Sequence, residues 1–440
     1  MIWIVAIFVI GYLFITLEHT FHINKAASAL LAGVLCWTIY ATQLGDVHLV
    51  NEQLMHHLSE ISGILFFLLG AMTIVEIIDL HDGFEVIISR IRTRCSKKLL
   101  WILGGLAFVL SAILDNLTTT IVLVSLLRKL VPQRDQRLFY AGMVIIAANA
   151  GGAFTPIGDV TTTMLWIGGQ ITTENIVQTL FFPSLACFIF PMLYLTFKRS
   201  SSSNSLQALD VAPVEHSKLD STPFERKLVL GLGVAALVFV PIFKYLTHLP
   251  PYMGILLGLG ILWVVIELVH HKKAEEEKTK FSVLTALKKV DSATVLFFLG
   301  ILLSIGALQS AGQLAIMANV LDAQIGNFYA INFLVGLLSA VVDNVPLVAA
   351  MMRMYHVEYP TDHAFWEFLA YCAGTGGSVL IIGSAAGVAA MGLEKINFMW
   401  YLRKMSGLAL IGYIAGALVF LLQQQVVSNK ATIMQIFVIN

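Results

Sequence analysis

Two six-residue segments place the same acid and amide pair inside strongly apolar sequence. Ser111–Asn116 reads SAILDN and Ser339–Asn344 reads SAVVDN, so the two differ only by aliphatic exchanges at two positions. A carboxylate at the centre of a bilayer costs about 2.5–3.5 kcal/mol or more unless it is paired, hydrated or protonated. Asp115 and Asp343 are therefore candidate functional residues, and in each segment the serine precedes the aspartate by four residues, on the same helix face.

The chemistry that these segments suggest is cation binding. Each offers a carboxylate, an amide oxygen, a hydroxyl and backbone carbonyls, which are hard oxygen ligands suited to a small hard cation. Burial raises the pKa of an aspartate above about 3.9, whereas a bound cation lowers it, so one carboxylate can hold either a proton or a metal ion. We expect sodium or lithium to compete with protons at Asp115 and Asp343. The alternative is that the Asp-Asn pairs only cap the helices that follow them.

A second pair of segments combines glycines with polar residues. Asn149–Asp159 reads NAGGAFTPIGD and Gly374–Ser384 reads GTGGSVLIIGS, with the glycine pair and the later glycine matched at an offset of 225 positions. Clustered glycine, with a proline in the first copy, unwinds a helix and frees backbone carbonyls. Close helix packing through small residues is the alternative. Asp159 adds a third carboxylate and favours a functional interpretation.

The composition indicates that these residues lie in a membrane protein. The chain has 440 residues, of which 58% are hydrophobic and only 12% charged, against about 25% charged in a soluble domain. The formal net charge of zero leaves no basic footprint for nucleic acid. The four cysteines form no CxxC pair, which argues against a disulfide framework or a cysteine metal site. The first 15 residues are predicted to span the membrane and not to be a removed signal peptide.

Apolar runs of membrane-spanning length recur along the chain. They lie at about 2–17, 26–43, 61–79, 99–127, 138–168, 177–197, 227–246, 252–270, 292–310, 328–352, 364–392 and 400–424. Two polar linkers, at 198–226 and 270–289, are expected to be solvated loops. The run at 99–127 has basic residues at both ends, which favours a re-entrant hairpin with Asp115-Asn116 at its tip. The run at 328–352 has the same design, with Asp343-Asn344 at its tip.

A repeat organises these runs. Leu65–Gly70 (LFFLLG) resembles Leu296–Gly300 (LFFLG), and an acidic residue lies five positions before each. The order helix, hairpin, broken helix, helix therefore occurs twice, over 60–197 and 291–424. Five runs separate the hairpins, so the second copy is inverted. We expect an all-α polytopic membrane protein with two re-entrant hairpins, two broken helices and about ten full crossings.

The remaining segments complete this domain layout. Residues 1–59 supply the first scaffold helices, 198–290 a linker and the second scaffold helices, and 425–440 a tail. With both termini outside, only Lys244, Arg353 and Lys430 lie outside and the other 24 of 27 basic residues lie inside. The positive-inside rule favours that orientation. Since no transit segment is visible, we expect a bacterial inner membrane, with periplasmic termini.

These motifs resemble those of a known family. The SxxxDN tips, GGAFTPIGD and LFFLLGAMTIVE are similar to those of NhaD-type sodium/proton antiporters of the ion transporter superfamily, over nearly the whole chain. The resemblance implies a homodimer in lipid with a scaffold domain and a moving transport domain, working by elevator-like alternating access. It implies no cofactor besides the transported sodium or lithium and protons. It also implies cation-site roles for Ser111, Asp115, Asn116, Asn149, Asp159, Thr161, Ser339, Asp343, Asn344 and Ser378.

Divalent-anion/sodium symporters, which are structural relatives of that family, offer the main alternative. Their tips read Ser-Asn-Thr, and the Asn-Thr part helps to hold a substrate carboxylate. Here the tips read Asp-Asn-Leu and Asp-Asn-Val, which adds negative charge and removes a hydroxyl donor. Cation/proton exchange is therefore favoured over symport of a dicarboxylate or other anion. A channel would need a continuous pore, and an enzyme is not indicated because Gly374-x-Gly376 lacks a βαβ context.

Weaker candidates lie near the membrane faces. Glu60, Glu76 and Asp291 are candidates for a gate or proton path, with helix-end capping as the alternative for Glu60 and Asp291. His48, His56 and His57 are expected in an outer loop, where a pH sensor is less favoured than ordinary surface histidines. Arg353 is expected to pair with Glu358 or Asp362.

Overall fold

The computed structural model describes residues 2–16, 18–89, 95–200, 221–271 and 273–438. Within these ranges every regular element is a helix and no strand occurs. Most of the expected loop at 198–226 lies outside the described residues, as do the last two residues of the expected tail.

Seven helices within the described ranges are long and apolar enough to cross a membrane, or eight if α16 and α17 count as one bent span. They cover 25–44, 47–80, 173–197, 223–247, 251–270, 292–310 and 406–426. All seven correspond to expected crossings. The other three expected crossings are α1, which has only 15 residues, and the two broken helices. The chain is an all-helical polytopic membrane protein.

The chain divides into two units, each built from discontinuous segments. The first comprises 1–92, 213–324 and 349–356, and the second comprises 93–212, 325–348 and 357–440. The first unit contains α1 (Ile2–Thr16), α2 (Glu18–Phe21), α3 (Lys25–Leu44), α4 (Val47–Leu80), α5 (Glu85–Ile88), α11 (Pro223–Thr247), α12 (Pro251–His270), α13 (Glu275–Lys280), α14 (Val283–Lys289), α15 (Ser292–Ser310) and α16 (Gln313–Gln324).

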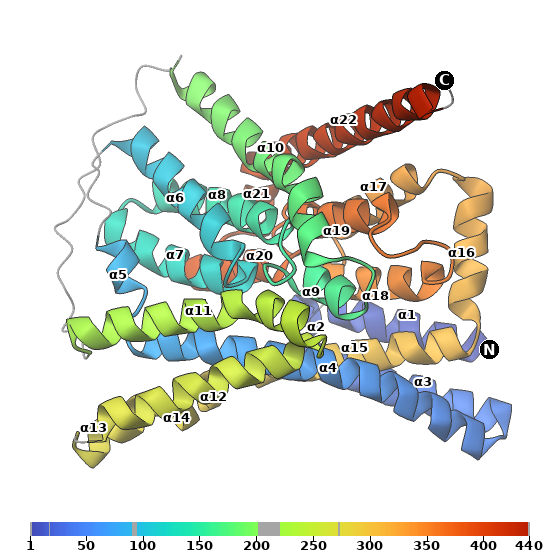
Figure 1. Ribbon diagram of the computed structural model, residues 1–440, viewed down its shortest axis with the longest axis horizontal. Coiled ribbons are helices and arrows are strands. Elements are labelled where there is room, and N and C mark those ends of the chain that lie inside the picture. The colour runs from blue at the N-terminus through green and yellow to red at the C-terminus, as the bar shows by residue number, and fades with distance from the viewer. Residues whose placement is uncertain (1, 17, 90–94, 201–220, 272, 439–440) are drawn as a thin grey trace. The chain divides into compact units, whose positions relative to one another are not determined.

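Helix α15 is central to the first unit, where it packs against α3 and α4 (Figure 1). Glycines allow the closest approach: a Cβ at Gly300 would lie 2.5 Å from the backbone nitrogen of Leu30, and one at Gly33 would lie 2.7 Å from the Gly300 carbonyl oxygen. The indole nitrogen of Trp37 donates to the Leu303 carbonyl at 2.9 Å. Helices α11 and α12 pack on each other and on α4.

Two expectations about loops in the first unit were wrong. Helix α4 begins at Val47, because the Asp46 side chain accepts hydrogen bonds from the first free backbone N–H groups. The three histidines expected in an outer loop therefore lie on this helix. The charged linker at 270–289 forms α13 and α14, and α14 packs on α4 with Val283 and Ala286 buried.

The second unit is built around two buried helices, α8 and α19. Nearly every residue of α8 from Leu138 to Gly152, and of α19 from Phe365 to Gly376, is buried. The unit contains α6 (Ser96–Ser111), α7 (Asn116–Leu130), α8 (Arg134–Gly152), α9 (Val160–Ile167), α10 (Thr173–Ser200), α17 (Phe328–Leu338), the start of α18 (Asn344–Tyr355), α19 (Ala364–Gly376), α20 (Ala385–Glu394), α21 (Phe398–Lys404) and α22 (Ser406–Val438).

Two short turns in this unit carry the Asp-Asn pairs. The chain reverses between α6 and α7, which pack against each other, and a comparable turn joins α17 to α18 (Figure 1). Helix α8 contacts α6 closely at a glycine, and α19 contacts α17 in the same way. A Cβ at Gly151 would lie 2.1 Å from the Phe108 carbonyl oxygen, and one at Gly376 would lie 2.0 Å from the Gly336 carbonyl oxygen. Only glycine fits at either crossing.

Candidate functional site

The Asp159 carboxylate, at the break between α8 and α9, is where the predicted residues meet. It caps α9, and its Oδ1 accepts hydrogen bonds from the backbone nitrogen and hydroxyl of Thr161 at 2.8 and 2.7 Å. Its Oδ2 accepts from Asn116 Nδ2 at 2.5 Å, and Asn344 Nδ2 lies 3.5 Å from Oδ1. The residue is 2% exposed. Amides from both hairpin tips therefore reach one buried carboxylate.

Two further side chains extend this cluster toward α20. Asn116 Nδ2 also donates to Asn149 Oδ1 at 3.0 Å, and Asn149 Nδ2 donates to the Ser384 hydroxyl at 3.0 Å. Asn149 is completely buried near the end of α8, and Ser384 caps α20. Both broken helices thus contribute to one hydrogen-bonded network.

The two tip aspartates are half-buried and begin the second helix of each hairpin. Asp115 accepts from the backbone nitrogen and hydroxyl of Thr118 at 2.7 and 2.9 Å, and its φ of 128° is unusual for a residue with a side chain. Asp343 accepts from the backbone nitrogen of Val345 at 3.2 Å. Both aspartates interact electrostatically with Asp159. They cap helices, as the alternative interpretation expected, within reach of a third carboxylate.

The predicted serines connect each hairpin to its neighbouring helix. The Ser111 hydroxyl donates to the Ala148 carbonyl at 2.6 Å, and the Ser339 hydroxyl to the Ala373 carbonyl at 3.1 Å. The Ser378 hydroxyl donates within its own turn, to Thr375. All three side chains are buried. Ser111 and Ser339 therefore fix the position of the tips relative to α8 and α19.

Sequence reasoning missed Ser384 and Thr118. Ser384 lies 225 positions after Asp159, the same offset that relates the glycines, so the repeat itself contained the signal. Thr118 lies 228 positions before Pro346, which has no N–H to donate to Asp343. The two tips are therefore capped differently.

The weaker candidates lie in the first unit. Glu60 accepts from Arg353 Nη2 at 2.5 Å, so the expected partners of Arg353, Glu358 and Asp362, were wrong. Glu76 lies 3.5 Å from Lys289 Nζ. Asp291 is exposed and caps α15, accepting from the backbone of Ala293 and Thr294.

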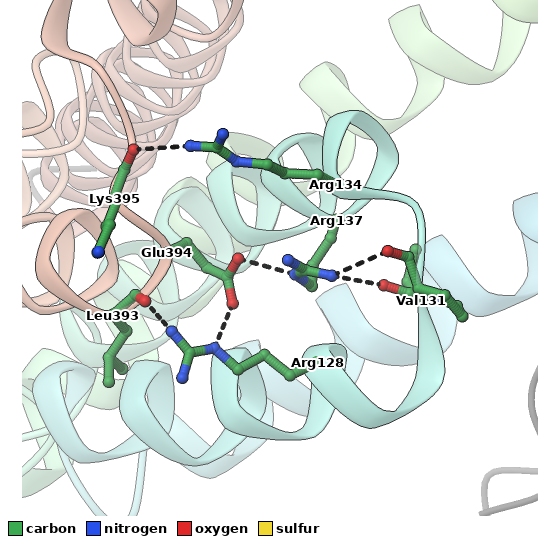
Figure 2. Close-up of polar contacts among 8 residues, drawn as sticks. Arg128, Val131, Arg134, Arg137, Leu393, Glu394 and Lys395 are labelled. Atoms are coloured by element: carbon green, nitrogen blue, oxygen red, sulfur yellow. Dashed lines mark hydrogen bonds and ion pairs between the residues drawn. The ribbon is translucent and has the colours of Figure 1, made fainter.

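An ion cluster in the second unit joins the end of α20 to the turn between α7 and α8 (Figure 2). The Glu394 side chain, 2% exposed, lies 2.7 Å from Arg128 Nε and 2.7 Å from Arg137 Nε. Arg137 also donates to the Val131 carbonyl at 3.0 Å, and Arg128 to the Leu393 carbonyl. The second broken helix is thereby held by the segment that follows the first hairpin.

The end of the first broken helix makes the corresponding contact with the segment that precedes α19. Asp362 accepts from the backbone nitrogen and hydroxyl of Thr172 at 2.6 and 2.8 Å. Its own backbone nitrogen donates to the Gln170 carbonyl at 2.9 Å. Each broken helix is thus held by the chain next to the other hairpin.

Comparison with known proteins identifies the family of the chain. A family model described as "Citrate transporter" matches residues 3–374. "Sodium/proton antiporter 1" of Arabidopsis thaliana is 50% identical, covering 94% of this chain and 71% of its own. "Na(+)/H(+) antiporter NhaD" of Alkalimonas amylolytica is 33% identical, covering 95% and 89%, and that of Vibrio cholerae 31%, covering 94% and 90%.

The chain belongs to the citrate transporter (CitMHS) family. The relatives named NhaD also confirm its similarity to NhaD-type antiporters, which the sequence motifs had indicated. Within this CitMHS protein, the Asp-Asn tips and the Asp159 segment that carried the resemblance are the elements that meet at one buried site.

Proposed function

We propose that this protein exchanges sodium or lithium for protons across a membrane by alternating access. The observation that carries the proposal is the convergence of both hairpin-tip amides on the buried Asp159 carboxylate. Relatives named sodium/proton antiporters, at 31–50% identity, support the same conclusion.

The exchange follows because the same carboxylate can bind either a cation or a proton. When protons leave the site, Asp159 and the tip aspartates Asp115 and Asp343 attract a small cation, and the nearby amide and hydroxyl oxygens are hard ligands for it. When the cation leaves, the buried carboxylate favours a proton, because a bare charge is costly there. The amide groups of Asn116 and Asn344 hold the carboxylate in place in both cases. Asn149, Thr161, Ser111, Ser339 and Ser378 complete or support the site.

The arrangement of the second unit supports a moving transport domain with an inverted repeat and two re-entrant hairpins. Gly151 and Gly376 make equivalent crossings, and Asp159 and Ser384 cap equivalent helices. We assign the second unit as the transport domain and the first as the scaffold of a homodimer, with elevator-like motion and about ten full crossings. Glu60, Glu76 and Asp291 fall in the scaffold as candidates for a gate or proton path.

We place both termini outside, in a bacterial inner membrane. The excess of Lys and Arg on the inner side supports the orientation. The relatives named NhaD are bacterial, which supports the choice of membrane, while the plant relatives show that similar chains occur elsewhere.

Sodium-coupled symport of a carboxylate is the second candidate, favoured by the name of the family model. Two properties of the site oppose it. Three aspartates lie together, and the amides of Asn116 and Asn344, which could donate to an anion, are directed at Asp159. A citrate or dicarboxylate anion would meet like charge and few free donors.

Proton flux in proteoliposomes tests the proposal. Vesicles loaded with a pH-sensitive dye are challenged in turn with sodium, lithium, potassium, citrate and succinate. We expect sodium or lithium alone to drive proton movement. Sodium entry that requires citrate or succinate would support symport instead.

A further inference from the structure

Three potential metal ligands gather on one turn of α4, in the first unit. His56 Nδ1 and His57 Nδ1 each lie 3.8 Å from Glu60 Oε2, and the three atoms all lie within 4.8 Å of one another. The spacings of three and four residues place Glu60 on the face between the two rings. Two imidazole nitrogens and a carboxylate oxygen form a ligand set typical of zinc.

The His57 ring has one nitrogen in a hydrogen bond and the other without one, as metal-binding histidines do before the metal is bound. The residue is 6% exposed, and its Nε2 pairs with the Ser310 hydroxyl at 3.1 Å. Its Nδ1 is also buried but has no hydrogen-bond partner. A histidine that binds a metal through one nitrogen commonly engages the other in a hydrogen bond, which fixes the ring. Ser310 supplies that bond and leaves Nδ1 directed toward Glu60.

We propose that His56, His57 and Glu60 bind one divalent transition-metal cation of the zinc, copper or nickel class. Ligands about 2.0–2.1 Å from a tetrahedral metal lie about 3.3 Å apart, so the 3.8 Å separations need only small rotations. His56 is exposed and can rotate, and Glu60 is exposed but paired with Arg353. Three protein ligands leave a fourth position for water.

Arg353 determines how tightly such an ion binds. Its guanidinium donates to Glu60 Oε2, the oxygen nearest both rings. A metal ion must therefore displace this ion pair or share its carboxylate. Arg353 lies near the C-terminal end of α18, the helix that starts at Asn344. The metal site and the proposed sodium site need different ligands, and the proposal does not depend on ion exchange.

Calorimetric titration with zinc chloride tests the site on the full chain, purified without a polyhistidine tag. We expect one zinc ion per chain. His56→Ala and Glu60→Gln should each weaken binding about tenfold or more, the effect of losing a group that holds a metal. Arg353→Gln should strengthen binding, because the competing cation is gone. His48→Ala is the matched control, since His48 is an exposed histidine on the same helix, and it should leave binding unchanged.

Fluorescence quenching provides a second measurement. The Trp37 ring lies 5.8 Å from the His57 ring, centroid to centroid, so copper bound at the site should quench its emission. The quenching should be lost in Trp37→Phe and in His56→Ala. No zinc binding, equal losses in His48→Ala and His56→Ala, or weaker binding in Arg353→Gln would overturn the proposal.

Discussion

The two broken helices of the second unit have a similar backbone conformation at the break and differ in the side chain found there. Asp159 caps the start of α9 with φ −144° and ψ 147°, and Ser384 caps the start of α20 with φ −140° and ψ 152°. Both side chains accept from a backbone N–H in the following turn. Only the first copy carries a charge at this position. Matched glycines therefore accompany a similar backbone at both breaks, and the two breaks differ in that only the first has a charged side chain for the proposed cation site.

The distal ends of the same helices differ as well. The end of α20 is held by a buried carboxylate between two arginines, whereas the end of α9 is held by the half-buried Asp362 and a threonine. This difference matches the proposed orientation, in which basic residues gather on the inner side.

Removing the charge at the break should have the largest effect. Asp159→Asn should reduce sodium-driven proton flux about 100-fold, since losing a charged acceptor of two amides costs about 2–3 kcal/mol. Ser384→Ala removes a neutral cap and the acceptor of the Asn149 amide, and should cost about tenfold or less. Flux in proteoliposomes, with thermal unfolding as a check of folding, measures both. Equal losses of proton flux in the two variants would contradict the proposal that Asp159 binds the cation and Ser384 does not.

The distal ends should differ in stability. Glu394→Gln leaves Arg137 without its buried partner and should lower the free energy of unfolding by about 3 kcal/mol, with the half-exposed Arg128 contributing little. Asp362→Asn keeps an amide oxygen that can accept from Thr172 and should cost about 1 kcal/mol or less. Denaturant or thermal unfolding in detergent compares them. A larger loss in Asp362→Asn would reverse the ranking.

Gly151 and Gly376 each contact a carbonyl oxygen of a neighbouring helix in the same way, so their substitution should have equal effects on stability. Gly151→Ala and Gly376→Ala each place a methyl group against a carbonyl oxygen and should each destabilise by about 1–3 kcal/mol. Gly105→Ala, on α6, meets nothing within 4 Å and is the control. Thermal midpoints in detergent provide the measurement. A neutral substitution at either crossing would break the equivalence.

Buried histidines occur in the first unit, where they include the paired rings of His81 and His270. Burial lowers the pKa of His81, with His270 and Lys273 adding to the effect and Glu225 and the Ile77 carbonyl opposing it. The unfolded chain then binds more protons than the native state, so stability should fall as the pH drops below about 6.5. His81→Gln should reduce that loss slightly, and His48→Gln should not. An unchanged pH dependence of the thermal midpoint in His81→Gln would contradict this.

Sequence periodicity and repetition predicted much of this architecture, because apolar length and glycine spacing are local properties. The Asp-Asn tips, the breaks near Gly151 and Gly376, and Asp159 as a candidate were all visible in the sequence. The meeting of both tips at Asp159 was not, since it depends on how two hairpins 228 positions apart approach one break. Ser384 was missed because a serine in apolar sequence carries no charge cost to draw notice.

Errors arose where polarity was taken to indicate a loop. The stretch from Val47 to Glu60 is polar but has a capping aspartate and continues into an apolar helix, so it is helical. His57 is buried there against Gly306 and Trp37, contacts that no local pattern reveals.

Counting the protons released when sodium binds to the purified protein tests the central claim most directly. Calorimetric titrations of sodium in buffers with different ionisation enthalpies give that number without any transport. Competition at the Asp159 carboxylate predicts proton release on sodium binding in the unaltered protein and a reduced release in Asp159→Asn. Sodium binding with no proton release in the unaltered protein would contradict the account.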